Sequence, residues 1–147
     1  MGVFGCLLAK VDQHTGATNL VTGGIGTRRL IALTRYAIDH MADRYGLEVS
    51  MSRPLIELER PSKRKLIAKL RRLVGRPASA VLIGLGGHLN HWTVVCSISD
   101  LTLGLFDSSG LHRIRIDHCR TRHEKKLETT VEHVLRPGRI IGLAMEN

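Results

Sequence analysis

The sequence predicts an α+β domain in which N-terminal helices pack on an antiparallel β-sheet. Apolar residues recur at helical spacing in two stretches of the first half, residues 27–46 and 62–75. From residue 80 onward, short runs rich in β-branched residues alternate with turn residues. Because helices come first and strands then follow one another, we expect the helices to lie on one face of the sheet.

Composition favours one globular domain over the whole chain, residues 1–147. Apolar residues make up 43% of the chain but aromatics only 3%, so the core is expected to be aliphatic. No apolar run approaches the roughly 20 residues of a membrane helix, and residues 1–9 lack the basic start of a signal peptide. Three cysteines are too few for a disulfide framework and favour a cytoplasmic location. The sequence does not indicate an oligomeric state.

The individual elements follow from capping and turn residues. Thr27 and Ser62 each precede a periodic apolar run and are predicted to cap the two main helices, the second of which stops at Gly75. The remaining elements are a short helix over 5–14, a loop over 18–26, and strands over 47–51, 80–85, 92–98, 101–106, 112–116, 131–135 and 139–145. Strands 92–98 and 101–106 are expected to pair as a hairpin, and the last two strands as a closing hairpin around Arg136-Pro137-Gly138.

The first of these hairpins carries a histidine and an aspartate at its open end. His91 precedes one strand and Asp107 ends the other. An odd loop over residues 98–100, or a bulge, would put the two side chains side by side, with Cβ atoms roughly 4.5–5.5 Å apart, whereas a two-residue loop would put them on opposite faces. A carboxylate bonded to one ring nitrogen leaves the other nitrogen free to act as a base. The same spacing also fits a surface histidine and a turn-forming aspartate in an ordinary hairpin.

The run HLNHWTVVCSISDLTLGLFDSSGLHRI resembles the His–Asp half of papain-like cysteine peptidases, particularly the bacteriocin-processing (C39-type) group. In that group a His precedes an apolar strand, and an Asp followed by a Gly-containing turn ends the next strand. GIGTRRLIALTRYAIDHMADRYGLEV and SKRKLIAKLRRLVGRPASAVLIGL resemble the same group's second helix and its helix-strand unit before the His. The resemblance covers roughly residues 5–116 and implies a papain-like fold that hydrolyses a peptide or protein substrate without a cofactor.

The same resemblance implies a Cys–His–Asp triad. Its cysteine lies at the start of a helix, where the helix N-terminus and an imidazolium stabilise the thiolate. Cys6 is the only cysteine with this placement, so we expect Cys6 as nucleophile, His91 as base and Asp107 as the group that orients it. Cys96, inside the hairpin, is expected to be a small buried hydrophobe. Asn90 and Gly87 are candidate substrate or oxyanion contacts.

An alternative interpretation is a catalytically inactive relative. Residues 1–5 contain no Gln, although the family places one before its cysteine to help form the oxyanion hole. A second alignment places the central helix at residues 26–45, whose start contains no Cys. In this interpretation the domain binds a peptide or an anionic partner, either nucleic acid or an acidic protein, through its cleft and a basic helix.

That basic helix accounts for much of the formal net charge of +9. Residues 60–76 contain eight basic side chains and no acid. Four of them fall on one helical face and are candidate anion-binding residues: Lys65, Lys69, Arg72 and Arg76. Such a face binds nucleic-acid phosphates through counterion release, and it is equally typical of the solvated side of a packed helix.

Two further clusters do not match known site patterns. The first contains His112, His118, Cys119 and His123. Its spacing fits no strong zinc pattern, so no metal site is predicted. The second contains Gly84, Gly86 and Gly87, which no Lys-Ser/Thr pair follows, so it is no phosphate loop. These glycines are instead expected to let a loop approach the site beside His88 and His91.

Overall fold

The computed structural model describes residues 25–107 and 110–146 and shows an α+β fold. The described residues divide into two compact units, 25–51 with 145–146, and 52–107 with 110–144. The described part of the first unit contains the long helix α3 (Thr27–Tyr45) and most of strand β1 (Val49–Ser52). Within residues 25–107 and 110–146, no helix has the length and apolar character needed to cross a membrane.

Helix α3 confirms the predicted helix but not its predicted cap. Gly26 occupies the N-cap with an extended backbone and gives no side-chain cap, so Thr27 is already the first helical residue. The prediction of Thr27 as cap is therefore wrong, because the helix begins one residue earlier, at a glycine that the N-cap tolerates. The helix ends at Gly46, whose φ of 64° lies in the left-handed region and whose N–H donates to Ala42.

The second unit is built around strand β2 (Ser79–Gly87). One edge of β2 pairs with β3 (His91–Ile98), which continues through β4 (Thr102–Phe106) to β5 (Arg113–Arg115), all antiparallel. The sheet order in this unit is β8-β2-β3-β4-β5. The short strands β6 (Cys119–Thr121) and β7 (His133–Leu135) form the one parallel pair among the described strands. The prediction of an antiparallel sheet is confirmed apart from that pair.

The predicted closing hairpin is wrong. Strands β7 and β8 (Ile140–Met145) both run antiparallel to β2 and lie one after the other along the same edge. β7 pairs with Gly86 and Gly87, and β8 pairs with residues 79–83. Between them the 3₁₀ turn η2 (Pro137–Arg139) interrupts the strand. Because Pro137 lacks an N–H for the ladder, Arg-Pro-Gly makes a break in one strand rather than a reversal.

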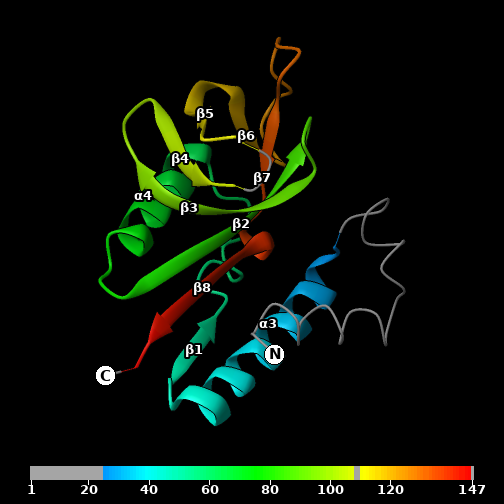
Figure 1. Ribbon diagram of the computed structural model, residues 1–147. Coiled ribbons are helices and arrows are strands. Elements are labelled where there is room, and N and C mark those ends of the chain that lie inside the picture. The colour runs from blue at the N-terminus through cyan, green and yellow to red at the C-terminus, as the bar shows by residue number, and fades with distance from the viewer. Residues whose placement is uncertain (1–24, 108–109, 147) are drawn as a thin grey trace. The chain divides into compact units, whose positions relative to one another are not determined.

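Helix α4 (Lys63–Val74) covers one face of this sheet and contacts β2 and β3 (Figure 1). The Ser62 side chain accepts a hydrogen bond from the Lys65 N–H at 3.3 Å, so the predicted cap is confirmed. Leu66 and Leu70 are fully buried under the helix. As predicted, the core is aliphatic, and its fully buried strand residues include Ile83, Leu85, Leu103, Leu135 and Ile140.

Candidate active site

A β-bulge at Cys96 determines which side chains of β3 and β4 share a face. The pairs are Val94–Phe106 and Val95–Leu105 on one side of the bulge, and Ser97–Gly104 and Ile98–Leu103 on the other. Cys96 is therefore an extra residue in β3, and it reverses the alternation of side chains along the rest of the strand. Without this bulge, His91 and Asp107 would point to opposite faces. The sequence predicts that a His91–Asp107 pair needs either an odd loop or a bulge, and the structure has the bulge.

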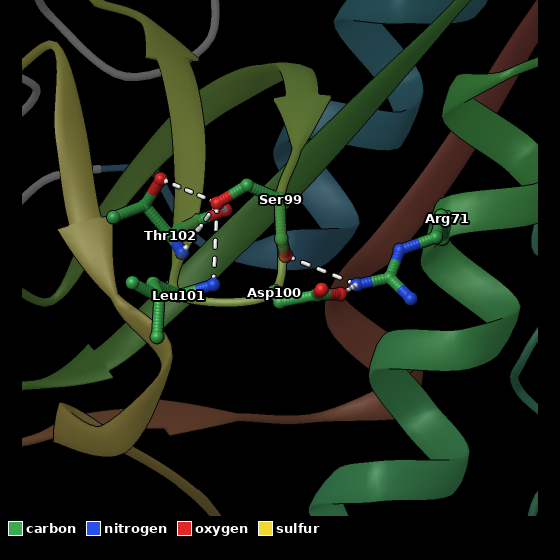
Figure 2. A network of polar contacts seen from close by, with 5 residues as sticks. All are labelled: Arg71, Ser99, Asp100, Leu101 and Thr102. Carbon is green, nitrogen blue, oxygen red and sulfur yellow. Dashed lines mark hydrogen bonds and ion pairs between the residues drawn. The ribbon is translucent and has the colours of Figure 1, made fainter.

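The turn between the two strands is held by its own hydroxyl and by α4 (Figure 2). The Ser99 Oγ accepts hydrogen bonds from the N–H groups of Leu101 at 3.2 Å and Thr102 at 2.9 Å. Arg71 of α4 donates to the Ser99 carbonyl at 3.0 Å and to Asp100 Oδ1 at 3.1 Å. The Arg71–Asp100 pair is exposed and contributes little by itself. Together these contacts fix the position of the turn, and with it the pairing of the strand residues next to the turn, on the other side of the bulge from His91 and Asp107.

His91 and Asp107 form a short hydrogen bond at the open end of this hairpin. The Nε2 of His91 lies 2.7 Å from Asp107 Oδ2. The Asp107 side chain is 1% exposed and the His91 side chain 38% exposed. A buried carboxylate accepts from Nε2–H, which places the ring's lone pair on Nδ1. The arrangement is an imidazole with an oriented tautomer that is partly exposed to solvent.

The two other predicted contacts lie in or beside the turn that leads into His91. Asn90 has a left-handed backbone with φ of 41°, and its Oδ1 accepts a hydrogen bond from Arg139 Nη1 at 3.2 Å. Gly87 ends β2 with φ of 80° and pairs with His133 of β7. The predicted nucleophile, Cys6, falls outside the described residues, so its assignment stays a prediction.

The cysteines that the structure describes differ sharply in environment. Cys96 is exposed at the bulge, so the prediction that it is buried is wrong. A bulge residue has no partner across the ladder, and its side chain can turn outward. Cys119 is buried, its thiol donates to the Arg115 carbonyl at 3.3 Å, and burial raises its pKa to about 12. A thiol with that pKa is almost entirely protonated at neutral pH and is a poor nucleophile.

The sequence predicts that the glycines of β2 let a loop approach the site. They do allow close approach, but the groups that approach are the segment entering β7 and an arginine side chain. A Cβ at Gly87 would overlap the Glu132 carbonyl oxygen, and a Cβ at Gly84 would overlap the Arg139 guanidinium. The Arg139 guanidinium carbon lies 4.9 Å from the centroid of the Trp92 ring. Sequence reasoning did not identify this arginine. The only sequence signal for it was the run Arg-Pro-Gly-Arg at residues 136–139 in a chain that has a single tryptophan.

Sequence reasoning also missed His133, a histidine that is only 3% exposed. Its Nδ1 is buried with no hydrogen-bond partner among the described residues. Burial, and secondly the charges of His88 and His118, lower its pKa from the ordinary value of 6.5. The unfolded chain therefore binds the proton more readily than the folded one, and this contribution to stability is lost as the pH falls below 6.5.

We expect the free energy of unfolding to fall between pH 7 and pH 5, with His133 contributing a slope of at most about 1.4 kcal/mol per pH unit. In His133→Gln this part of the slope should disappear, as measured by denaturant unfolding across that range. His123→Gln, at an exposed position, serves as the control and should keep the wild-type slope. If His133→Gln also keeps the full slope, another group carries the acid sensitivity.

The four predicted anion-binding residues of the basic helix are not neutralised within the described part of the chain, whereas Arg71 of the same helix pairs with Asp100. Three of the predicted anion-binding residues, Lys65, Lys69 and Arg72, lie on α4, while Arg76 follows its end. None of these four side chains forms a hydrogen bond or ion pair with any residue in 25–107 or 110–146. Over the same ranges, no group of three or more His, Cys, Asp or Glu side chains could hold a metal ion.

No protein-family model, curated protein or solved structure matches this chain. The geometry of the His91–Asp107 pair is therefore the basis on which a function is proposed.

Proposed function

We propose that this chain is a cysteine-peptidase-like hydrolase with a papain-like fold, acting on a peptide through Cys6, His91 and Asp107. The observation that carries the proposal is the 2.7 Å bond between a partly exposed imidazole and a buried carboxylate. A surface histidine beside a turn aspartate does not need the carboxylate to be buried. For a histidine that acts as a general base, burial of the carboxylate is useful, because a carboxylate shielded from water orients the imidazole and stabilises its protonated form.

In the proposed mechanism His91 Nδ1 takes the proton of the Cys6 thiol. The thiolate then attacks the carbonyl carbon of the scissile amide. When the tetrahedral intermediate collapses, the C–N bond breaks and the amine leaves with the proton from His91. Water activated by His91 then cleaves the thioester, which releases the acid and restores the thiol.

The negative oxygen of the intermediate requires hydrogen-bond donors. The Cys6 backbone N–H is one candidate. Asn90 is a second candidate, because Arg139 occupies its Oδ1 and thereby leaves its Nδ2 hydrogens free to donate. Gly87 remains a proposed substrate contact, because it ends β2 and only the turn of residues 88–90 separates it from His91.

The test compares alkylation of the three cysteines by iodoacetamide at pH 7, measured by mass spectrometry of each cysteine peptide. We expect Cys6 to react about 10 to 30 times faster than the exposed Cys96, because pairing with His91 raises its thiolate fraction. Buried Cys119 should react slowest. His91→Ala should remove the advantage of Cys6, and the control His112→Ala, at an exposed histidine, should keep it. Equal and slow alkylation of Cys6 and Cys96 in the wild type would contradict the triad.

A second candidate function, binding of an anionic partner by a catalytically inactive domain, is favoured by the unpaired cations of α4. Its test is the affinity for a single-stranded oligonucleotide as a function of salt. Lys69→Gln with Arg72→Gln should reduce the slope of log affinity against log salt by about 1.4, since each lost phosphate contact contributes about 0.7. Lys125→Gln with Lys126→Gln, on an exposed segment, is the matched control. An unchanged slope in the α4 variant would exclude this surface.

A further inference from the structure

Two arginines lie over the glycine positions of β2. Gly84 and Gly86 point to the same face of the strand, about 7 Å apart. A Cβ at Gly84 would be 2.9 Å from the guanidinium carbon of Arg139, and a Cβ at Gly86 would be 3.9 Å from Arg136 Nε. Both guanidiniums thus occupy neighbouring places on a part of the sheet that carries no side chains of its own.

Arg139 is held in one orientation. Its guanidinium lies 4.9 Å from the centre of the Trp92 ring, which is a cation–π contact, and its Nη1 donates to Asn90 Oδ1 at 3.2 Å. Trp92 and His91 are consecutive in β3, so their side chains point to opposite faces of the sheet. The arginine pair therefore lies on the opposite face of the strand from the His91–Asp107 pair, and Asn90 is the residue that contacts it from the proposed catalytic site.

The charges of the pair are not compensated within the described part of the chain. No carboxylate from residues 25–107 or 110–146 lies within 4.0 Å of a guanidinium nitrogen of Arg136 or Arg139. The Nε of Arg139 is buried and has no hydrogen-bond partner there. Burial, and secondly the charge of Arg136, lower the pKa of Arg139. An anion beside the two guanidiniums would relieve both effects.

A third arginine supports the turn that carries the pair. Arg53 Nη2 donates to the Gly138 carbonyl at 2.7 Å, directly before Arg139, while its Nε is buried without a partner among the described residues. Gly84 is covered by Arg139 itself and Gly86 by Val134, so the feature that would attract an anion is the pair of guanidiniums, with Arg53 holding the turn between them.

We propose that Arg136 and Arg139 bind the phosphate group of a small ligand beside their guanidiniums, which lie next to Gly84 and Gly86 of β2. Two guanidiniums match the double negative charge of a phosphate monoester or of free phosphate, and each presents a planar fork of donors to the oxygens. A carboxylate carries one charge and would leave the second cation unpaired. This site is additional to the proposed peptide hydrolysis and does not depend on it.

The protein contains its own reporter for this site, because Trp92 is its single tryptophan and contacts Arg139. Inorganic phosphate is titrated into the full-length protein at constant ionic strength, with chloride as the balancing anion, and the emission of Trp92 is followed. We expect a saturable change that chloride and acetate do not produce. Arg136→Gln, which does not touch Trp92 in any described contact, should weaken phosphate binding at least tenfold, whereas Arg122→Gln on an exposed turn should not.

Phosphoserine, titrated in parallel, separates the two sources of a phosphate group. Tighter binding of phosphoserine assigns the site to a phosphate ester, and equal binding assigns it to free phosphate. Thermal unfolding of each variant gives an independent readout, since phosphate should raise the midpoint of wild type and Arg122→Gln but not of Arg136→Gln. The proposal is overturned if phosphate acts no differently from chloride, if acetate binds equally well, or if Arg136→Gln binds phosphate as wild type does.

Discussion

Replacing Asp107 by Ala is expected to lower the rate of hydrolysis of a fluorogenic peptide pool about 100- to 10,000-fold. The wild-type carboxylate accepts from Nε2–H of His91, so the ring lone pair is on Nδ1. An alanine offers no acceptor to Nε2–H, so neither the tautomer nor the orientation of the ring is fixed. The protonated form of the base would also have lost the charge that stabilises it.

The control for this substitution is Asp117→Ala. Asp117 is exposed, and its hydrogen bond to Arg115 holds its pKa at about 2, so it too is a carboxylate at neutral pH. Its loss should leave peptide hydrolysis unchanged. Circular dichroism of both variants establishes that the fold is intact. If Asp107→Ala is folded and keeps more than half of the wild-type rate, the His–Asp pair has no part in the chemistry.

Local signals in the sequence were sufficient for the elements whose ends are encoded locally. Ser62 caps α4 because a hydroxyl three residues before a backbone N–H is enough to define the start of a helix. The hairpin of β3 and β4 follows similarly from two apolar runs around a polar turn. The pairing of His91 with Asp107 could be stated only as a condition, since its outcome depends on whether the strands contain an irregularity.

The features that the sequence did not reveal depend on contacts between distant segments. The bulge at Cys96 arises from the register between two strands, and no residue type marks it. The collinear β7 and β8 look like a hairpin because Arg-Pro-Gly is also a turn signal, and only the length of β2 shows that both strands fit on one edge. Arg139 can reach Trp92 only because Gly84, the strand neighbour of Trp92, has no side chain in the way. The spacing of apolar residues along the sequence does not show this contact.

Gly87→Ala is expected to destabilise the protein by about 2–5 kcal/mol, measured as the free energy of unfolding in urea. One part is conformational, because φ at Gly87 is 80° and an L-residue there costs about 1–2 kcal/mol. The other part is steric, about 1–3 kcal/mol, because the new Cβ would overlap the Glu132 carbonyl oxygen. That oxygen accepts a hydrogen bond from the His88 N–H at 2.8 Å, so it cannot retreat without losing the bond.

Gly110→Ala separates these two parts. Gly110 has a φ of 83°, and a Cβ there would meet nothing within 4 Å among the described residues. This variant should show only the conformational loss, so the difference between the two variants measures how firmly the Glu132 backbone is held against the end of β2. Equal losses would mean that β7 moves away at little cost. A larger loss at Gly87 would show that the chain needs a glycine there for packing, and that the substrate contact proposed at this position is built on a backbone that β7 holds in place.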